Sequence, residues 1–357
     1  MKQIIFVAQV MAVILFNKIS LLAQQVEKTD TSIVRIVNPR QDLKLWYGSD
    51  DFRVDNFVVL PEYTLLYNKN LSTFRLLSNQ AMLVQDTYKL LSIRSIKPHI
   101  VDNKKHAIGA LDPWFTVLND STILAGTAPF KGRKAVSGYV KIVIAQAKLY
   151  IEHIPFLIDE KTDNVDASRT QFITNYIDYK GGSVFVSYIP LNKTDGYVFN
   201  GSVYVKSLQK ELALLYETPL IEKKEVNAIQ LLSIDGKLLI YDPTTEQVRI
   251  ATTDLGALTL IDLSKIIPAG LLSGKRSFRH FLLDRVNKQL YYRIAYFDKG
   301  VSDQLYMKVL LSTDSLTAEP ILRTAMMGFR GSYVNNSRLF FYDEAKGYIY
   351  VTKEDIP

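Results

Sequence analysis

The chain has 357 residues, of which 48% are hydrophobic and 22% are charged, and its formal net charge is +7. It contains no cysteine, which excludes a disulfide framework, thiolate metal sites, a cysteine nucleophile and a lipidated N-terminal cysteine. The mild positive charge suits an anionic glycan or a membrane surface as well as nucleic acid.

The first 23 residues have the pattern of a secretory signal peptide. Lys2 precedes an apolar run over residues 4–16, and Ala23 is a small residue at a suitable cleavage site. Because this run is shorter than the roughly 20 residues of a membrane-spanning helix, we prefer a signal peptide over residues 1–23 to a membrane anchor. We expect residues 24–357 to form one domain, secreted or periplasmic, monomeric, with no transmembrane segment and no nucleic-acid partner.

Short strands recur in groups of four along this region. The first strands of five successive groups begin near residues 55, 113, 171, 227 and 278. The fourth group has strands at 227–234, 237–242, 246–253 and 257–263. Its Asp235-Gly236 pair is a strong hairpin signal, because glycine adopts positive φ at no steric cost. This repetition predicts stacked copies of one four-stranded antiparallel unit.

A sixth group begins near residue 330 and has only three strands before Pro357. We expect residues 31–38 to supply its fourth strand by pairing with residues 347–353, which would close a ring and remove an exposed sheet edge. The predicted fold is an all-β, six-bladed β-propeller of four-stranded antiparallel blades, with the last blade closed by an N-terminal strand. In spacing and turn chemistry the chain resembles the divergent six-bladed propellers exported by bacteria.

The predicted connections differ between the two faces of such a propeller. Turns joining first to second and third to fourth strands lie on one face, which we call the short-turn face. Connections between second and third strands, and links between blades, lie on the opposite long-loop face. The longest predicted connections belong to the long-loop face and include residues 88–112, 129–138, 159–170, 190–200 and 264–277. Long loops on a rigid scaffold commonly carry binding sites.

Two sets of candidate ligand-binding residues fall on the long-loop face. The first is a basic cluster in the connections around blades one and two: Lys104, Lys105, Lys131, Arg133 and Lys134. The second consists of residues near the starts of the inner strands, facing a central channel: Trp114, Arg169, Arg279, His280 and Arg330. Guanidinium groups match carboxylates and phosphates. Both sets are equally consistent with solvated polar groups that have no ligand.

The sequence favours a binding or interaction scaffold over an enzyme. The four histidines lack metal-ligand spacing, and no serine-hydrolase, phosphate-loop or zinc-protease motif is present. We therefore expect no metal and no cofactor, and a partner that is an anionic glycan, another anionic ligand or a protein. The alternative is a hydrolase or lyase that acts on a glycan or lactone in the channel, with His280 and the neighbouring arginines as active groups.

Overall fold

The structure is a computed structural model with two compact units, Met1–Arg35 and Ile36–Pro357. Only Arg35 of the first unit is described, so the predicted signal peptide lies outside the described residues. The structure describes residues 35–37, 39–89, 99–101, 104–106, 111–127, 139–154, 172–179, 182–190, 199–206, 212–217, 229–243, 245–251, 258–267, 277–298, 301–312, 315–327, 329–343 and 345–357.

The second unit consists of antiparallel sheets whose strands follow one another along the chain. Blade one contains β3 (Asn56–Val59), β4 (Tyr63–Asn68), β5 (Thr73–Ser78) and β6 (Val84–Lys89). Blade two contains β9 (Leu111–Asn119), β10 (Thr122–Thr127), β11 (Tyr139–Ala145) and β12 (Lys148–Ile154). Blade three contains β13 (Phe172–Tyr179), β14 (Gly182–Pro190), β15 (Phe199–Lys206) and β16 (Leu212–Glu217). Blade four contains β17 (Gln230–Ile234), β18 (Lys237–Asp242), β19 (Gln247–Ala251) and β20 (Thr259–Asp262).

Two further sheets include strands from the N-terminal end of the chain. The five-stranded sheet contains β21 (Ser277–Asp284), β22 (Gln289–Asp298), β23 (Val301–Leu311), β24 (Leu316–Met327) and β1 (Arg35–Val37). The closing blade contains β25 (Phe329–Asn335), β26 (Arg338–Asp343), β27 (Tyr348–Thr352) and β2 (Leu43–Tyr47). A short helix, α2 (Pro39–Asp42), precedes β2, and β7 (His99–Val101) with β8 (Lys104–His106) forms a separate hairpin.

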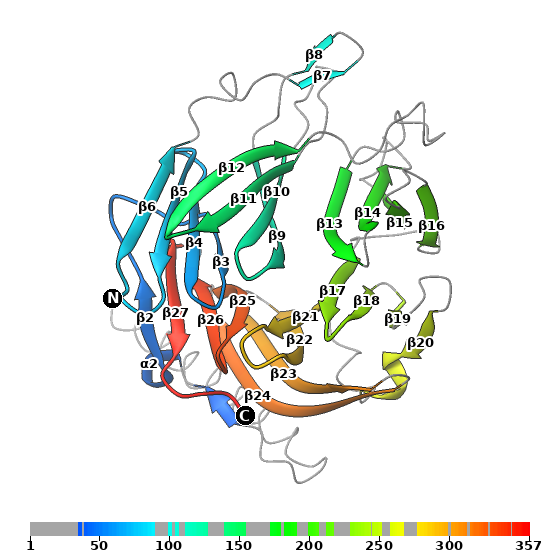
Figure 1. Cartoon of the computed structure of the whole chain (residues 1–357). Helices are drawn as coiled ribbons and strands as arrows, with labels where there is room; N and C mark the ends of the chain where they lie inside the picture. Colours follow the sequence, from blue (N-terminus) through cyan, green and yellow to red (C-terminus); the bar gives the residue numbers. More distant parts are fainter. Residues whose placement is uncertain are drawn as a thin grey trace, which may run out of the picture. The chain divides into compact units, whose positions relative to one another are not determined.

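The first strands of these sheets contact one another in series within the second unit. β3 contacts β9, and the series continues through β13, β17, β21 and β25, which returns to β3 (Figure 1). The prediction of an all-β propeller with four-stranded antiparallel blades is therefore confirmed. Five sheets have the predicted four strands, whereas the sheet that begins with β21 has five. In the described part of the chain, no helix is long and apolar enough to cross a membrane.

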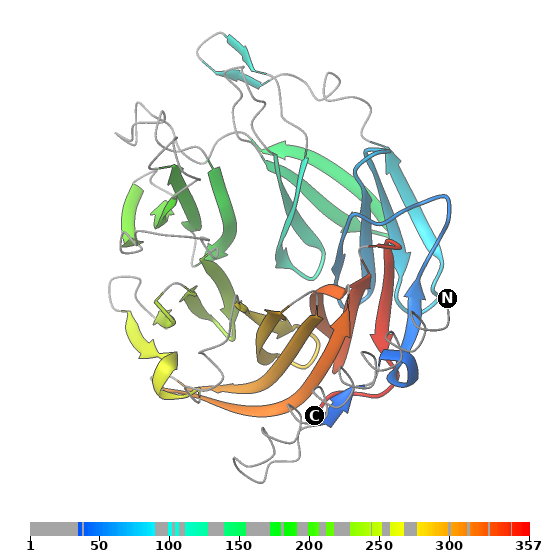
Figure 2. The ribbon, with the colours of Figure 1, turned by 180° about the vertical axis from the view of Figure 1, so that it is seen from behind.

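The predicted N-terminal segment that closes the last blade was wrong. The outer partner of β27 is β2, with Leu43 opposite Thr352 and Lys44 opposite Val351, so residues 43–47 and not 31–38 close this blade (Figure 2). Of residues 31–38, the structure describes Arg35–Val37 as β1, which lies beside β24 instead. The N-terminal region thus supplies an outer strand to two sheets.

The core lies between neighbouring sheets and explains why many strands are apolar at consecutive positions. Leu238, Leu239, Ile240 and Tyr241 of β18 are all 0% exposed. A middle strand of a propeller blade is covered on both faces by the adjacent blades, so the two-residue alternation of a half-buried strand disappears.

On the short-turn face, Asp284 joins the five-stranded sheet to the closing blade. Its carboxylate is 0% exposed. Oδ1 accepts from the backbone N–H groups of Val286, Asn287 and Asn336 at 3.1, 3.3 and 3.0 Å. Oδ2 accepts from the Asn287 side chain at 3.0 Å and from the Ser337 N–H at 2.7 Å. Asn336 and Ser337 both have positive φ, at 49° and 57°, so this carboxylate also holds a tight turn of the left-handed type.

Candidate functional site

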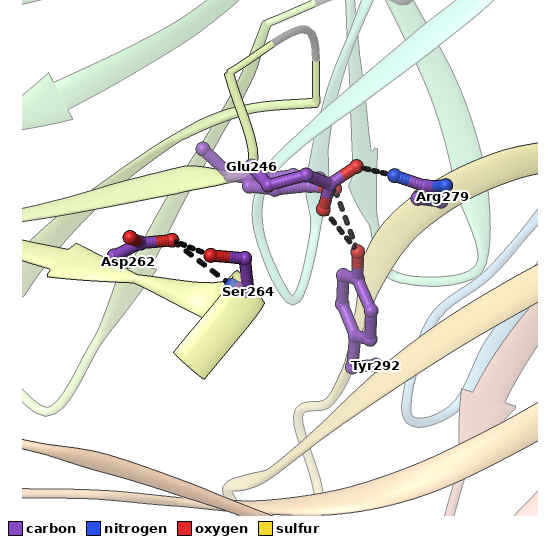
Figure 3. Close-up of polar contacts among 6 residues, drawn as sticks. Glu246, Asp262, Ser264, Arg279 and Tyr292 are labelled. Atoms are coloured by element: carbon purple, nitrogen blue, oxygen red, sulfur yellow. Dashed lines mark hydrogen bonds and ion pairs between the residues drawn. The ribbon is translucent and has the colours of Figure 1, made fainter. Parts of the chain in front are cut away.

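The best-described polar cluster on the long-loop face centres on Glu246. Glu246 ends the connection between β18 and β19 and has a φ of 54°. This left-handed conformation lets the chain reverse within a few residues. Its carboxylate contacts Arg279 of β21 and Tyr292 of β22, both from the neighbouring five-stranded sheet (Figure 3). The cluster therefore ties the second-to-third connection of blade four to the next sheet.

The contacts satisfy both oxygens of the Glu246 carboxylate. Oε1 pairs with the Arg279 guanidinium, and the two side chains are only 13% and 14% exposed. Oε2 lies 3.1 Å from the Tyr241 hydroxyl and 3.0 Å from the Tyr292 hydroxyl, and the two hydroxyls are 2.8 Å apart. Oε2 and the two tyrosine hydroxyl oxygens share two protons. One hydroxyl therefore donates to Oε2, and the second hydroxyl donates either to Oε2 or to the oxygen of the first hydroxyl.

The electrostatics of this cluster fit a structural contact. Burial, and then the neighbouring Tyr292, raise the pKa of Tyr241 well above its ordinary value. Tyr241 therefore stays protonated over the physiological range and keeps its donor. The Arg279 charge is matched by the Glu246 carboxylate at close range. The cluster therefore holds the connection between β18 and β19, and the Arg279 guanidinium is already paired with the Glu246 carboxylate.

A short helix reinforces the same loop from outside. The 3-10 helix η1 (Leu263–Lys265) follows β20, and its Leu263 N–H donates to the Glu246 carbonyl at 2.9 Å. Asp262 caps this helix by accepting from the backbone N–H of Ser264 at 3.0 Å and from its hydroxyl at 2.5 Å (Figure 3). These hydrogen bonds from Ser264 lower the pKa of the Asp262 carboxyl. Backbone and side chain of Glu246 are thus both anchored.

His280, the residue after Arg279, belongs to a different environment. Successive residues of a strand point to opposite faces of its sheet. Arg279 meets Glu246 of blade four, whereas His280 Nε2 lies 3.3 Å from Nη1 of Arg293, its cross-strand neighbour on β22. Burial, and then the positive charge of Arg293, hold the pKa of His280 well below its ordinary value. The imidazole is therefore neutral at neutral pH and accepts a hydrogen bond from the guanidinium.

The structure describes the side chains of only two predicted site residues, Arg279 and His280, and it separates them onto opposite faces of one sheet. This separation does not favour the alternative in which His280 and Arg279 act together on one substrate. For Lys104, Lys105, Trp114 and Arg330 only the strand position is described, on β8, β9 and β25. Lys131, Arg133, Lys134 and Arg169 lie outside the described residues.

Glu246, Tyr292 and Arg293 were not predicted from the sequence as site residues. Glu246 follows two threonines in a segment interpreted as a plain turn, and only its three-dimensional position next to Arg279 reveals its role. Arg293 did carry a signal, because it is a lone charge inside the apolar strand LYYRIAY. Among the described residues, no cluster of His, Asp and Glu is arranged to hold a metal ion.

Comparisons with known proteins give no family for the chain. No family model matches it, and no curated protein matches its sequence. Among solved structures it is similar to a member of the DUF4221 family from Bacteroides vulgatus, with 11% identity over 88% of this chain and 98% of that one and a TM-score of 0.47. A luciferin-regenerating enzyme and a Bacteroides fragilis protein described as exported each have 10% identity, cover 88% of this chain and 96% of their own, and have TM-scores of 0.45.

Proposed function

We propose that this protein is an exported β-propeller that works as a binding scaffold and takes an anionic ligand, such as an acidic glycan, on its long-loop face. The observation that carries this proposal is the hairpin of β7 and β8, which the link between blades one and two inserts as a separate two-stranded sheet. Lys104 and Lys105 lie on this hairpin, opposite Val101 and Ile100. A basic hairpin in a long connection between two blades is a suitable landing surface for a polyanion.

Further parts of the proposal concern the architecture and export. We count the five-stranded sheet as one blade, which brings the total to six. Its strands β21–β24 repeat the order of the other blades, and β1 only extends their outer edge. We also infer that residues 1–23 are a signal peptide that is removed on export, leaving a single monomeric domain over residues 24–357. Mass spectrometry of the exported protein tests the cleavage point, and sedimentation tests the oligomeric state.

The binding test uses immobilised sulfated or uronic-acid polysaccharide and anionic liposomes. The mature protein should be retained at low salt and released as salt shortens the screening length from about 10 Å at 0.1 M to about 3 Å at 1 M. A variant with Lys104, Lys105, Lys131, Arg133 and Lys134 changed to Ser should lose retention. Separate polysaccharide and liposome arms distinguish a glycan from a lipid surface.

A charge-matched control decides whether the effect is local. Five exposed lysines elsewhere in the chain are changed to Ser: Lys44, Lys69, Lys288, Lys346 and Lys353. This control removes the same total charge and should keep most of the retention. Equal loss in both variants would mean that net charge alone governs binding, and equal retention of wild type and the first variant would contradict the proposed face.

A further inference from the structure

Arg293 is a buried cation without a carboxylate partner among the residues that the structure describes. Its side chain lies in the middle of the five-stranded sheet and is 4% exposed. Its one hydrogen-bonding contact is with His280, at 3.3 Å. Its Nε–H is buried and has no acceptor in the described part of the chain. A guanidinium has five N–H donors, so most of its donor capacity is unused.

Such an arrangement is costly for a folded protein. Buried charges are normally paired, because removing an ion from water without compensation costs several kcal/mol. Arg279, on the opposite face of the same sheet, shows how a buried cation is normally paired, since Glu246 matches its charge. Burial lowers the pKa of Arg293, and Tyr306 only partly opposes this effect. The residues that the structure describes therefore keep a cation at this position without supplying an anion for it.

The neighbours of Arg293 form a partly polar environment between two sheets. Tyr306 is its cross-strand partner on β23 and donates to Gln304 Oε1 at 2.7 Å. Tyr306 packs in one cluster with Val334 and Phe341 of the closing blade. Arg293 shares this face of its sheet with Tyr291 by the two-residue period, and Tyr291 belongs to the same cluster. The guanidinium thus faces the closing blade.

We propose that Arg293 and His280 form a binding site for one anionic group, a carboxylate or a phosphate, between the five-stranded sheet and the closing blade. The unused N–H groups of Arg293 form the planar fork that binds such groups with two parallel hydrogen bonds. His280 lies on the first strand of its sheet, directly opposite Arg293, and is less completely buried than the guanidinium, so the pair presents its polar atoms on one face of the sheet. The neutral imidazole adds no charge that would have to be compensated.

This inference rests on the proposed function, because it names the chemical group, a carboxylate or a phosphate, that an anionic ligand would present. It concerns Arg293 and His280 instead of the basic residues of the long-loop face. The basic hairpin attracts a polyanion by long-range charge, whereas Arg293 takes a single group in a desolvated position. Retention on polysaccharide and occupancy of the Arg293 site can therefore fail independently.

The test measures the thermal unfolding midpoint of the mature protein in acetate and in inorganic phosphate. A bulky sulfonate buffer at equal ionic strength serves as the reference. A ligand that binds only the folded state should raise the midpoint by about 2 to 5 °C at ten times its dissociation constant. The variant Arg293→Met should lose this response. In the sulfonate reference it should melt at the same or a higher temperature than wild type, because the uncompensated charge is gone.

Arg338→Met is the matched control, since Arg338 is an exposed arginine paired with Asp355 on the closing blade. It removes the same charge and should keep the anion response. A wild-type protein with no anion response, an Arg293→Met variant that responds like wild type, or one that melts well below wild type in every buffer would each overturn the proposal. The last result would identify Arg293 as a structural core residue.

A second measurement does not depend on the variant folding. The chain has four histidines, so His280 can be assigned in spectra of histidine-labelled protein by comparison with His280→Gln. Acetate or phosphate bound beside Arg293 should shift the His280 signals and raise its pKa, since the anion offsets the charge of Arg293. Among the described residues, Tyr306 and Tyr291 are the titratable groups that share this face of the sheet with the pair. Unchanged His280 signals at saturating anion would contradict the site.

Discussion

Two buried carboxylates hold the opposite faces of this propeller in different ways. Asp284, on the short-turn face, accepts five hydrogen bonds, four of them from backbone N–H groups of two turns. Glu246, on the long-loop face, uses its carboxylate only for side chains, namely Arg279 and two tyrosines. The first carboxylate fixes the course of the backbone itself. The second holds a loop through side chains that have rotamers of their own.

The difference indicates where the molecule is able to vary. A backbone N–H has a fixed direction, so a carboxylate that satisfies four of them allows one turn geometry only. Side-chain contacts can be exchanged for contacts with a ligand without moving the sheets. The contacts of Asp284 thus restrain the short-turn face more strictly than the contacts of Glu246 restrain the long-loop face.

The largest expected effect is on the short-turn face. Asp284→Ala leaves five donors without their acceptor, and we expect it to lower the free energy of unfolding by about 4 kcal/mol. Urea unfolding followed by fluorescence measures this loss. Glu62→Ala is the control, because Glu62 is an exposed acid in another short turn and should change stability by less than about 0.5 kcal/mol. A loss below about 1 kcal/mol for Asp284→Ala would mean that the two turns keep their conformation without the hydrogen bonds to this carboxylate.

The Glu246 cluster should be less important for global stability. Glu246→Gln removes the carboxylate charge that pairs with the Arg279 guanidinium, and we expect a loss of about 3 kcal/mol. Tyr292→Phe removes one hydrogen bond and should cost about 1 kcal/mol. Hydrogen exchange should also accelerate around residues 243–246 in Glu246→Gln, whereas the sheets stay protected. A larger global loss than for Asp284→Ala would reverse the comparison of the two faces.

The repeat in the sequence was sufficient to predict the blades because each one is a local unit. Turn signals such as Asp235-Gly236 fix a hairpin from adjacent residues, and Gly236 has the expected positive φ of 73°. The closing strand was misplaced because it pairs with residues about 300 positions away. Residues 31–38 were predicted as a strand and residues 43–47 were not, and turn chemistry gives no information on which sheet edge an N-terminal strand joins.

The candidate site shows the same division between local and distant information. Arg279 and His280 were recognised as polar residues near the start of an inner strand, but their partners are set by neighbouring sheets. Arg279 meets an acid 33 positions earlier in the chain. Arg293 could have been found from its isolation in an apolar strand. That no carboxylate of the described residues pairs with it could be learned only from the folded protein.

A pair of glycines tests whether the long-loop face is tolerant throughout. Gly236 on the short-turn face has a φ of 73° and no atom within 4 Å of an added Cβ. Gly347 on the long-loop face has a φ of 71°, but an added Cβ would lie 2.6 Å from Arg53 Cγ and 3.1 Å from the backbone nitrogen of Val54. Both Gly→Ala variants suffer the same backbone strain. Because only the added Cβ at Gly347 meets neighbouring atoms, Gly347→Ala should lower the free energy of unfolding by about 1 to 2 kcal/mol more than Gly236→Ala in urea. Equal losses would show that Arg53 and Val54 move aside at little cost.

The last expected effect is a pH dependence at His280, which depends on a single side chain. Burial and Arg293 hold its pKa well below the ordinary value of 6.5, so the unfolded chain takes up a proton at this residue before the folded protein does. Unfolding is then favoured as the pH falls below about 6.5, by at most about 1.4 kcal/mol per pH unit, until the folded pKa is reached. Above that range the residue contributes no pH dependence. His280→Gln should abolish this part of the acid destabilisation while the part due to carboxylates remains. Parallel stability curves for wild type and His280→Gln between pH 7 and 5 would show that the imidazole is free to take a proton in the folded protein, and that its contact with Arg293 is weak.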